Sequence, residues 1–197
     1  MEYRKVVTTP YRRFVVLLIV STLPTGILGL LLESVVESVA NNLLIVGLNL
    51  LGTGGILFVS DLIESGKKKQ KDINYGDAFT VGFAQGIATL PGVSRSGTTI
   101  TCCLLCGFDR KYAVKYSFIM SMPVIFCAMI MELFKIGESG IGVSAGGCIL
   151  GMLFATVIGY VALKIMDKLV VSKYFKYFSF YCFLMGAVSI IVFLVKL

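Results

Sequence analysis

The sequence predicts an all-α polytopic membrane protein with about five spanning helices and one re-entrant helical hairpin. Hydrophobic residues make up 57% of the 197 residues and charged residues only 15%, a composition outside the usual range of soluble globular domains. The basic residues lie in short blocks between long apolar stretches, the pattern that sets the topology of membrane proteins. At this length we expect a single membrane domain, residues 1–197.

Five stretches are apolar enough to be spanning helices. Four of them carry no charge and are 19 to 25 residues long, which suffices to cross a hydrocarbon core of about 30 Å. The fifth is shorter, but Lys115 can extend its amino group to the interface and Glu132 follows at the far end. In chain order the predicted spans are residues 14–32, 38–60, 116–131, 139–163 and 177–195.

Residues 78–108 form a different kind of segment. They are apolar on both sides of Arg95, but Pro91, Gly92 and Gly97 would interrupt a continuous helix. Irregular backbone is tolerated at membrane depth only where protein or a wet cavity satisfies its polar groups. The pattern therefore predicts two half-helices joined by an irregular tip.

The distribution of charge favours a hairpin that leaves the membrane on the side it entered. With a hairpin, 15 of the 18 basic residues fall on one side, whereas a full crossing would divide the basic residues 10 against 7, with Arg95 inside the membrane. The positive-inside rule then predicts a cytoplasmic N-terminus and an external C-terminus. The 15 residues are Arg4, Lys5, Arg12, Arg13, Lys67, Lys68, Lys69, Lys71, Arg110, Lys111, Lys115, Lys164, Lys168, Lys173 and Lys176.

The net charge of +7 does not indicate a nucleic-acid-binding protein, because the basic residues do not form a solvated face with interleaved aromatics. Cys102, Cys103 and Cys106 form a local cluster, yet they lie in an apolar stretch without a second cysteine pair at zinc spacing. We interpret these cysteines as packing residues of a membrane helix. No metal ligands are identified in the chain, and the absence of histidine removes the commonest general base.

Arg95 is the main candidate for chemistry. An arginine in the middle of a membrane segment costs about 2.5 kcal/mol or more, so it usually faces a cavity or a partner. A phosphate fits as that partner, because a guanidinium binds phosphate bidentately and a helix N-terminus presents N–H groups to an anion. The alternative is an Arg95 paired internally beside residues that cap broken helices. Hydroxyls and flexible backbone around it are supplied by Ser94, Ser96, Thr98, Thr99, Gly92 and Gly97.

Gln85 lies on the first half-helix, six residues before Pro91. Its amide could form hydrogen bonds toward the hairpin tip or with a neighbouring helix. The sequence leaves both alternatives open.

Residues 82–100 resemble the second signature segment of the undecaprenyl pyrophosphate phosphatase family, the bacitracin-resistance membrane phosphatases. That signature reads approximately G-x-x-Q-x-x-A-x-x-P-G-x-S-R-S-G-x-T-I, and the chain matches every fixed position. The likeness continues around Pro24 and Pro123, and it covers nearly the whole chain, aligned with the C-terminal two-thirds of the family.

The resemblance implies hydrolysis of a polyprenyl diphosphate to the monophosphate, which recycles the lipid carrier of cell-wall synthesis. It implies catalytic roles for Arg95, Ser94 and Ser96, and substrate contacts for Gln85, Gly92, Gly97, Thr98 and Thr99. It also implies a bacterial plasma membrane, a Mg²⁺ or Ca²⁺ cofactor, contacts with membrane lipids, and a homodimer as a candidate assembly.

The first signature segment of that family, E-G-x-T-E-F-L-P-x-S-S-T-G-H, does not occur in this sequence. It carries the glutamates and histidine implicated in metal binding and attack. We therefore expect either an N-terminally truncated form or a chain without independent catalysis. Two further hypotheses are a non-catalytic protein that binds or transports a lipid phosphate, and a structural remnant.

Overall fold

All regular elements of the structure, a computed structural model that describes residues 10–139 and 145–196, are α-helices. Five of these helices are long and apolar enough to cross a membrane, and only α4 and α5 are shorter. The predicted all-α polytopic membrane protein is therefore confirmed. The helices are α2 (Pro10–Val39), α3 (Leu43–Leu62), α4 (Tyr75–Ile87), α5 (Arg95–Leu105), α6 (Arg110–Ser139), α7 (Ala145–Val171) and α8 (Phe175–Val195).

Each predicted span corresponds to one long helix, although the ends differ. Helix α2 continues past Glu33 and Glu37, because the end of a spanning helix can carry charge where it reaches the interface. The span predicted from residue 38 begins only at Leu43, since the Asn42 side chain caps α3 by accepting a hydrogen bond from Leu44 N. Residues 140–144, at the start of the span predicted for 139–163, lie outside the described residues.

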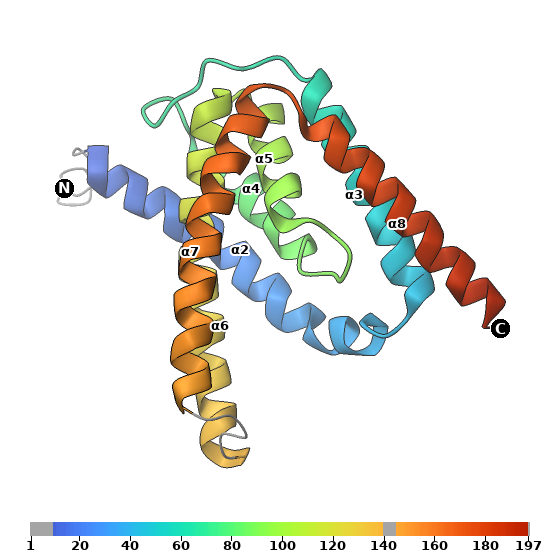
Figure 1. Ribbon diagram of the computed structural model, residues 1–197. Helices are drawn as coiled ribbons and strands as arrows, with labels where there is room; N and C mark the ends of the chain where they lie inside the picture. Colours follow the sequence, from blue (N-terminus) through green and yellow to red (C-terminus); the bar gives the residue numbers. More distant parts are fainter. Residues whose placement is uncertain (1–9, 140–144, 197) are drawn as a thin grey trace.

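Two helix pairs frame the short helices α4 and α5 (Figure 1). Helices α3 and α8 lie side by side on one flank, and α6 and α7 form a long hairpin on the other. Helix α4 packs on α2, while α5 lies against α3, α4 and α6. The two short helices are therefore enclosed by spanning helices.

Helices α4 and α5 form a hairpin whose two outer ends meet at one end of the molecule. Lys68, in the loop before α4, donates its N–H to Gly107 O just after α5, at 3.0 Å. Its amino group pairs with Asp77 in the first turn of α4, at 2.9 Å. With 13 residues, α4 is only about 20 Å long, too short to cross a core of about 30 Å.

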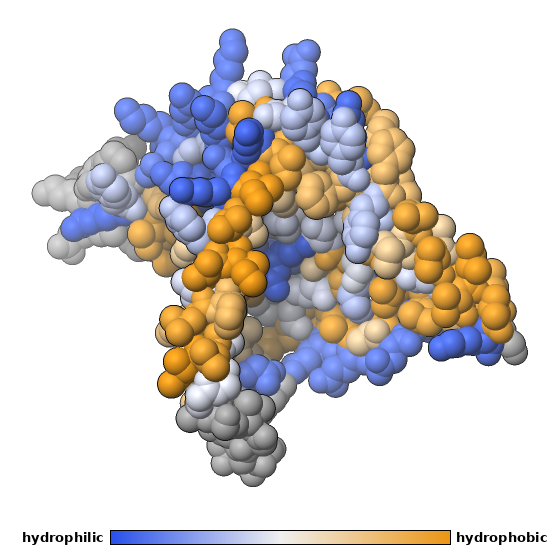
Figure 2. All heavy atoms as spheres, viewed as in Figure 1, coloured by the Kyte–Doolittle hydropathy of each residue, from blue (hydrophilic) through white to orange (hydrophobic). Residues whose placement is uncertain are grey.

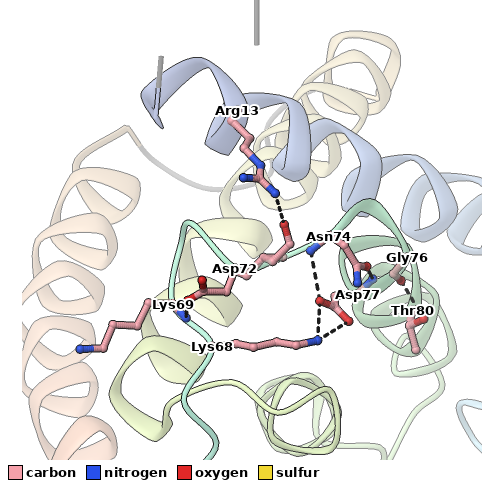
Figure 3. A network of polar contacts seen from close by, with 9 residues as sticks. Arg13, Lys68, Lys69, Asp72, Asn74, Gly76, Asp77 and Thr80 are labelled. Carbon is pink, nitrogen blue, oxygen red and sulfur yellow. Dashed lines mark hydrogen bonds and ion pairs between the residues drawn. The ribbon is translucent and has the colours of Figure 1, made fainter. Parts of the chain in front are cut away.

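The basic segments that the charge pattern placed on one side are linked by hydrogen bonds at this same end. Arg13 donates to Lys71 O and Ile73 O, both at 2.9 Å, and thus joins the start of α2 to the loop before α4. Figure 3 shows Arg13 pointing from α2 toward this loop. Arg110, at the start of α6, is buried and donates to Ser60 O and Val170 O, at the ends of α3 and α7. The grouping of these segments follows from contacts and is independent of any charge rule.

The surface between the two ends is apolar. Figure 2 shows hydrophilic residues gathered at the upper end and in a thinner band at the lower end, with hydrophobic helices between them. Large side chains on α7 and α8 are mostly exposed, for example Phe154 at 65% and Leu184 at 64%. Such a surface suits contact with lipid.

Candidate functional site

The tip of the α4–α5 hairpin is an irregular turn between two helix ends. Helix α4 ends at Ile87, before Pro91, which has no N–H to continue a helix. Gly92 has a φ of +90°, a conformation that favours glycine. Ser94 then caps α5, because its Oγ accepts a hydrogen bond from Gly97 N at 3.2 Å. The break predicted from proline and glycine is therefore present.

Two polar side chains of α3 hold this tip. Asn49 Nδ2 donates to Pro91 O at 2.8 Å. Thr53 Oγ1 donates to Gly92 O at 2.9 Å and accepts from Ser94 N at 3.1 Å. Neither residue was predicted from the sequence, where the only signal is that both are polar residues within an uncharged span.

A cavity of about 330 Å³ lies between the hairpin and α6. Figure 2 shows hydrophilic atoms in a hollow between the helices at this depth of the molecule. The hairpin contributes four of the predicted site residues, and α6 adds two serines that were not predicted from the sequence. The lining residues are Gln85, Arg95, Ser96, Thr99, Ser117, Phe118, Ser121 and Ile125.

Arg95 is exposed to this cavity, and its guanidinium has no hydrogen-bond or ion-pair partner among the described residues. The sequence left open the alternative of an internally paired Arg95. Among the described residues, the structure does not show that pairing. The N–H groups of Arg95 and Ser96 open α5 and also lack an acceptor there. A cationic side chain and two free N–H groups at a helix N-terminus together favour an anion.

Gln85 is 1% exposed, and of the two alternatives that the sequence left open its amide makes the hydrogen bond to a neighbouring helix. Its Nε2 donates to Thr25 Oγ1 on α2 at 3.3 Å, and the side chain also lines the cavity. Its Oε1 is buried and has no partner among the described residues. A buried carbonyl of this kind costs about 1–3 kcal/mol unless a ligand or water donates to it.

Thr99 links α5 to α6 beside the arginine. Its Oγ1 donates to Arg95 O at 2.9 Å and lies 2.5 Å from Ser117 Oγ. Ser117 is 3% exposed, so its hydroxyl is held at the cavity wall. Ser121 lies one helical turn further along α6 and also lines the cavity.

The other four predicted site residues do not line the cavity. Gly92 and Gly97 pack against α3, where an added Cβ would lie 2.7 Å from Val46 O and from Leu57 Cδ2, respectively. Ser94 is engaged as the cap of α5, and Thr98 Oγ1 is buried without a partner among the described residues. These residues shape the tip, whereas the cavity is lined by Gln85, Arg95, Ser96 and Thr99.

The cysteine cluster lies on the part of α5 that is remote from the tip. Cys103 is fully buried in the hydrophobic core, and Cys102 and Cys106 pack against that core. All three are free thiols. Their positions agree with the interpretation as packing residues.

The fold and the cavity together define a class: a multi-pass membrane protein with an arginine-lined cavity at the tip of a broken helical hairpin. The chain belongs to the family described as "Bacitracin resistance protein BacA", whose profile matches residues 1–188. The recognition of that family from residues 82–100 is therefore confirmed.

Curated relatives in this family are named undecaprenyl-diphosphatase. The relative from Methanosphaera stadtmanae is 36% identical over 188 residues, which are 95% of this chain and 67% of the relative. The relative from Thermosipho africanus is 41% identical over 182 residues, 92% of this chain and 71% of the relative. That from Desulforapulum autotrophicum is 38% identical over 179 residues, 91% of this chain and 64% of the relative. The chain thus spans about two thirds of the length of these proteins.

Proposed function

We propose that the cavity at the hairpin tip binds the diphosphate of a polyprenyl diphosphate, and that the chain acts in its hydrolysis. The observation that carries this proposal is the unpartnered Arg95 guanidinium beside two free N–H groups at the start of α5. The relatives' name, undecaprenyl-diphosphatase, indicates the reaction and the lipid. Spanning helices around the cavity suit a substrate whose tail lies in the membrane.

In the proposed reaction, water attacks the terminal phosphorus. The bond from that phosphorus to the bridging oxygen breaks, and inorganic phosphate and polyprenyl monophosphate leave. Negative charge accumulates on the phosphoryl oxygens and on the leaving oxygen, so catalysis depends mainly on positioning and charge stabilisation. Arg95 and the N–H groups of Arg95 and Ser96 supply that stabilisation, while the hydroxyl of Ser96 orients the phosphate.

The cavity does not by itself fit Mg²⁺ or Ca²⁺. These cations prefer several carboxylate or carbonyl oxygens, whereas the lining residues include one amide, four hydroxyls and a cationic arginine. No group of three or more histidine, cysteine or acidic residues suited to a metal occurs in the part of the chain that the structure describes. The cavity is therefore assigned to the phosphate alone.

We also propose the orientation and assembly that the charge pattern and family suggest. The end that carries the basic segments faces the cytoplasm of a bacterial cell, and the hairpin tip points toward the outer side. The N-terminus is then cytoplasmic and the C-terminus external. A homodimer remains a prediction, to be tested by the mass of the protein–detergent complex.

Release of inorganic phosphate from a polyprenyl diphosphate by the purified protein in detergent tests the function. We expect Arg95→Ala to reduce the rate by about 10²–10³, the usual effect of removing one strong charge-stabilising group. Arg95→Lys should recover only part of the rate, because an ammonium cannot bind phosphate through two parallel hydrogen bonds.

Arg12→Ala provides the matched control, since Arg12 is exposed near the start of α2 and does not line the cavity. This variant should release phosphate at the wild-type rate. Wild-type protein that releases no phosphate at any divalent-cation concentration would overturn catalysis by this chain. Full activity of Arg95→Ala would overturn the assigned site.

A further inference from the structure

The hairpin tip depends on a few contacts with α3 for its position. It consists of seven residues between α4 and α5, and its carbonyls at Pro91 and Gly92 both accept hydrogen bonds from α3 side chains. We infer that Thr53 and Asn49 are positioning residues, which act through the tip backbone to aim Arg95 and the N–H groups of α5 at the phosphate. This inference rests on the proposed function for its catalytic consequence only.

Thr53 is the central contact, because one hydroxyl serves two peptide groups. Its Oγ1 donates to Gly92 O and accepts from Ser94 N, so it bridges the backbone on both sides of Val93. The side chain is 3% exposed, and water cannot readily replace either bond. Ser94 N is the last donor before α5, and fixing it sets the direction in which the next two N–H groups point.

Asn49 and the Gly92 contact keep the tip close to α3. Asn49 lies one helical turn before Thr53, on the same face, and its Nδ2 donates to Pro91 O at 2.8 Å. Gly92 lies so near the helix that an added Cβ would be 2.7 Å from Val46 O. The α3 surface from Val46 to Thr53 therefore forms a seat for the tip.

Helix α3 is itself held firmly, so the seat has a fixed place in the molecule. Ser179 on α8 donates to Gly54 O at 2.6 Å, one residue after Thr53. Gly47 and Gly186 bring the two helices into backbone contact, because a Cβ at Gly186 would lie 2.9 Å from Gly47 O. The α3–α8 pair thus fixes the position of the seat. The hydrogen bonds of Thr53 and Asn49 then fix the hairpin tip relative to the seat.

Neither residue lines the cavity, so their loss should change geometry rather than remove a substrate contact. A displacement of about 1 Å in a positioning group can cost about a hundredfold in rate. We expect Thr53→Val to lower kcat by about tenfold to a hundredfold. KM should change much less, because Arg95 and the surroundings of the lipid tail are still present.

The experiment compares wild type, Thr53→Val, Thr53→Ser and Asn49→Ala by amide hydrogen exchange and by phosphate release. Valine has the shape of threonine without the hydroxyl, and serine restores the hydroxyl. Thr53→Val and Asn49→Ala should speed exchange in a peptide covering residues 91–97, with exchange in α8 unchanged, and Thr53→Ser should return it toward wild type. The control is Thr156→Val on α7, whose exposed hydroxyl donates only to Met152 O within its own helix.

Wild-type exchange at the tip of Thr53→Val would overturn the positioning role, as would a failure of Thr53→Ser to recover wild-type exchange. Faster exchange throughout α3 and α8 would overturn it too, since that result means general destabilisation. The exchange measurement needs no turnover. If wild type released no phosphate, the proposed function would fail, while exchange at the tip would still decide this inference.

Discussion

The Gln85 side chain shows how stability and function can separate at a single residue. Its Nε2 is satisfied by Thr25 on α2, whereas its Oε1 is buried without a partner among the described residues. Thr25 does not depend on Gln85, because its hydroxyl also donates to Gly82 O at 2.8 Å. An unsatisfied carbonyl of this kind destabilises the unliganded protein by about 1–3 kcal/mol. A water molecule is the donor that would satisfy this oxygen, since the diphosphate itself offers acceptors.

We therefore predict opposite effects of Gln85→Leu on stability and on activity. Leucine is of similar size and removes the unsatisfied oxygen, so the Tm in detergent should stay the same or rise. Phosphate release should fall by about tenfold or more, as expected for loss of a hydrogen bond in a buried site. A lowered Tm together with full activity would contradict this account.

The sequence predicted the site only where its residues are neighbours along the chain. Arg95, Ser96 and Thr99 fall within one turn of α5, and the motif identified them together with Gln85. The α3 and α6 contributors, such as Thr53 and Ser117, are isolated polar residues in apolar helices. Hydroxyl residues are common in spanning helices, and only the fold shows which of them face the tip.

Close packing of α4 on α2 positions the hairpin at the scale of the helices. Gly82 and Gly86 lie four residues apart on the face of α4 that contacts α2. A Cβ at Gly82 would lie 2.0 Å from Ser21 O, a backbone atom that cannot move aside easily. Small residues at this spacing let membrane helices approach closely, where apolar surface alone gives no driving force.

Gly82→Ala should accordingly lower the Tm of the protein in detergent. Overpacking of this kind costs about 1–3 kcal/mol, since α2 and α4 must separate. Gly26→Ala on α2 is the matched control, because a Cβ at Gly26 meets nothing within 4 Å. The control should be neutral or slightly stabilising, as alanine is the better helix former. Equal Tm values for the two variants would show that the glycine contact is not needed.

The helices were predictable from hydropathy, but their ends were not. Apolar windows stop at the first charge, whereas α2 continues through Glu33 and Glu37 to Val39. The hairpin, predicted for residues 78–108, has its first helix from Tyr75, because Asn74 and Asp77 form a capping box (Figure 3). Caps are local polar contacts that a hydropathy pattern does not register.

At the scale of the whole molecule, the hairpin decides the topology. Five spanning helices and one hairpin that returns to its own side place the two ends of the described chain on opposite faces (Figure 1). The contacts of Arg13, Lys68 and Arg110 gather the basic segments at one end without reference to a membrane. The charge pattern and the packing contacts are independent observations, and both support the same arrangement.

Cysteine labelling in intact cells tests this arrangement, because the two ends carry exposed residues in loops. Lys67 lies in the loop before α4 at the basic end, and Asn41 lies in the turn between α2 and α3 at the other. In a background with the six native cysteines replaced, Asn41→Cys should react with a membrane-impermeant maleimide in intact cells. Lys67→Cys should react only after permeabilisation, since the positive-inside rule keeps its loop in the cytoplasm.

Each labelling outcome bears on a different step of the topology. The reverse pattern would show that the basic end faces outward, which would contradict the charge rule for this protein. Reaction of both cysteines in intact cells would mean that α3 does not cross, because α3 separates the two positions. A third cysteine at exposed Lys111, just after the hairpin, should behave like Lys67→Cys. If it instead labelled from outside, residues 75–105 would cross the membrane fully, and the tip that carries Arg95 could not be a re-entrant site.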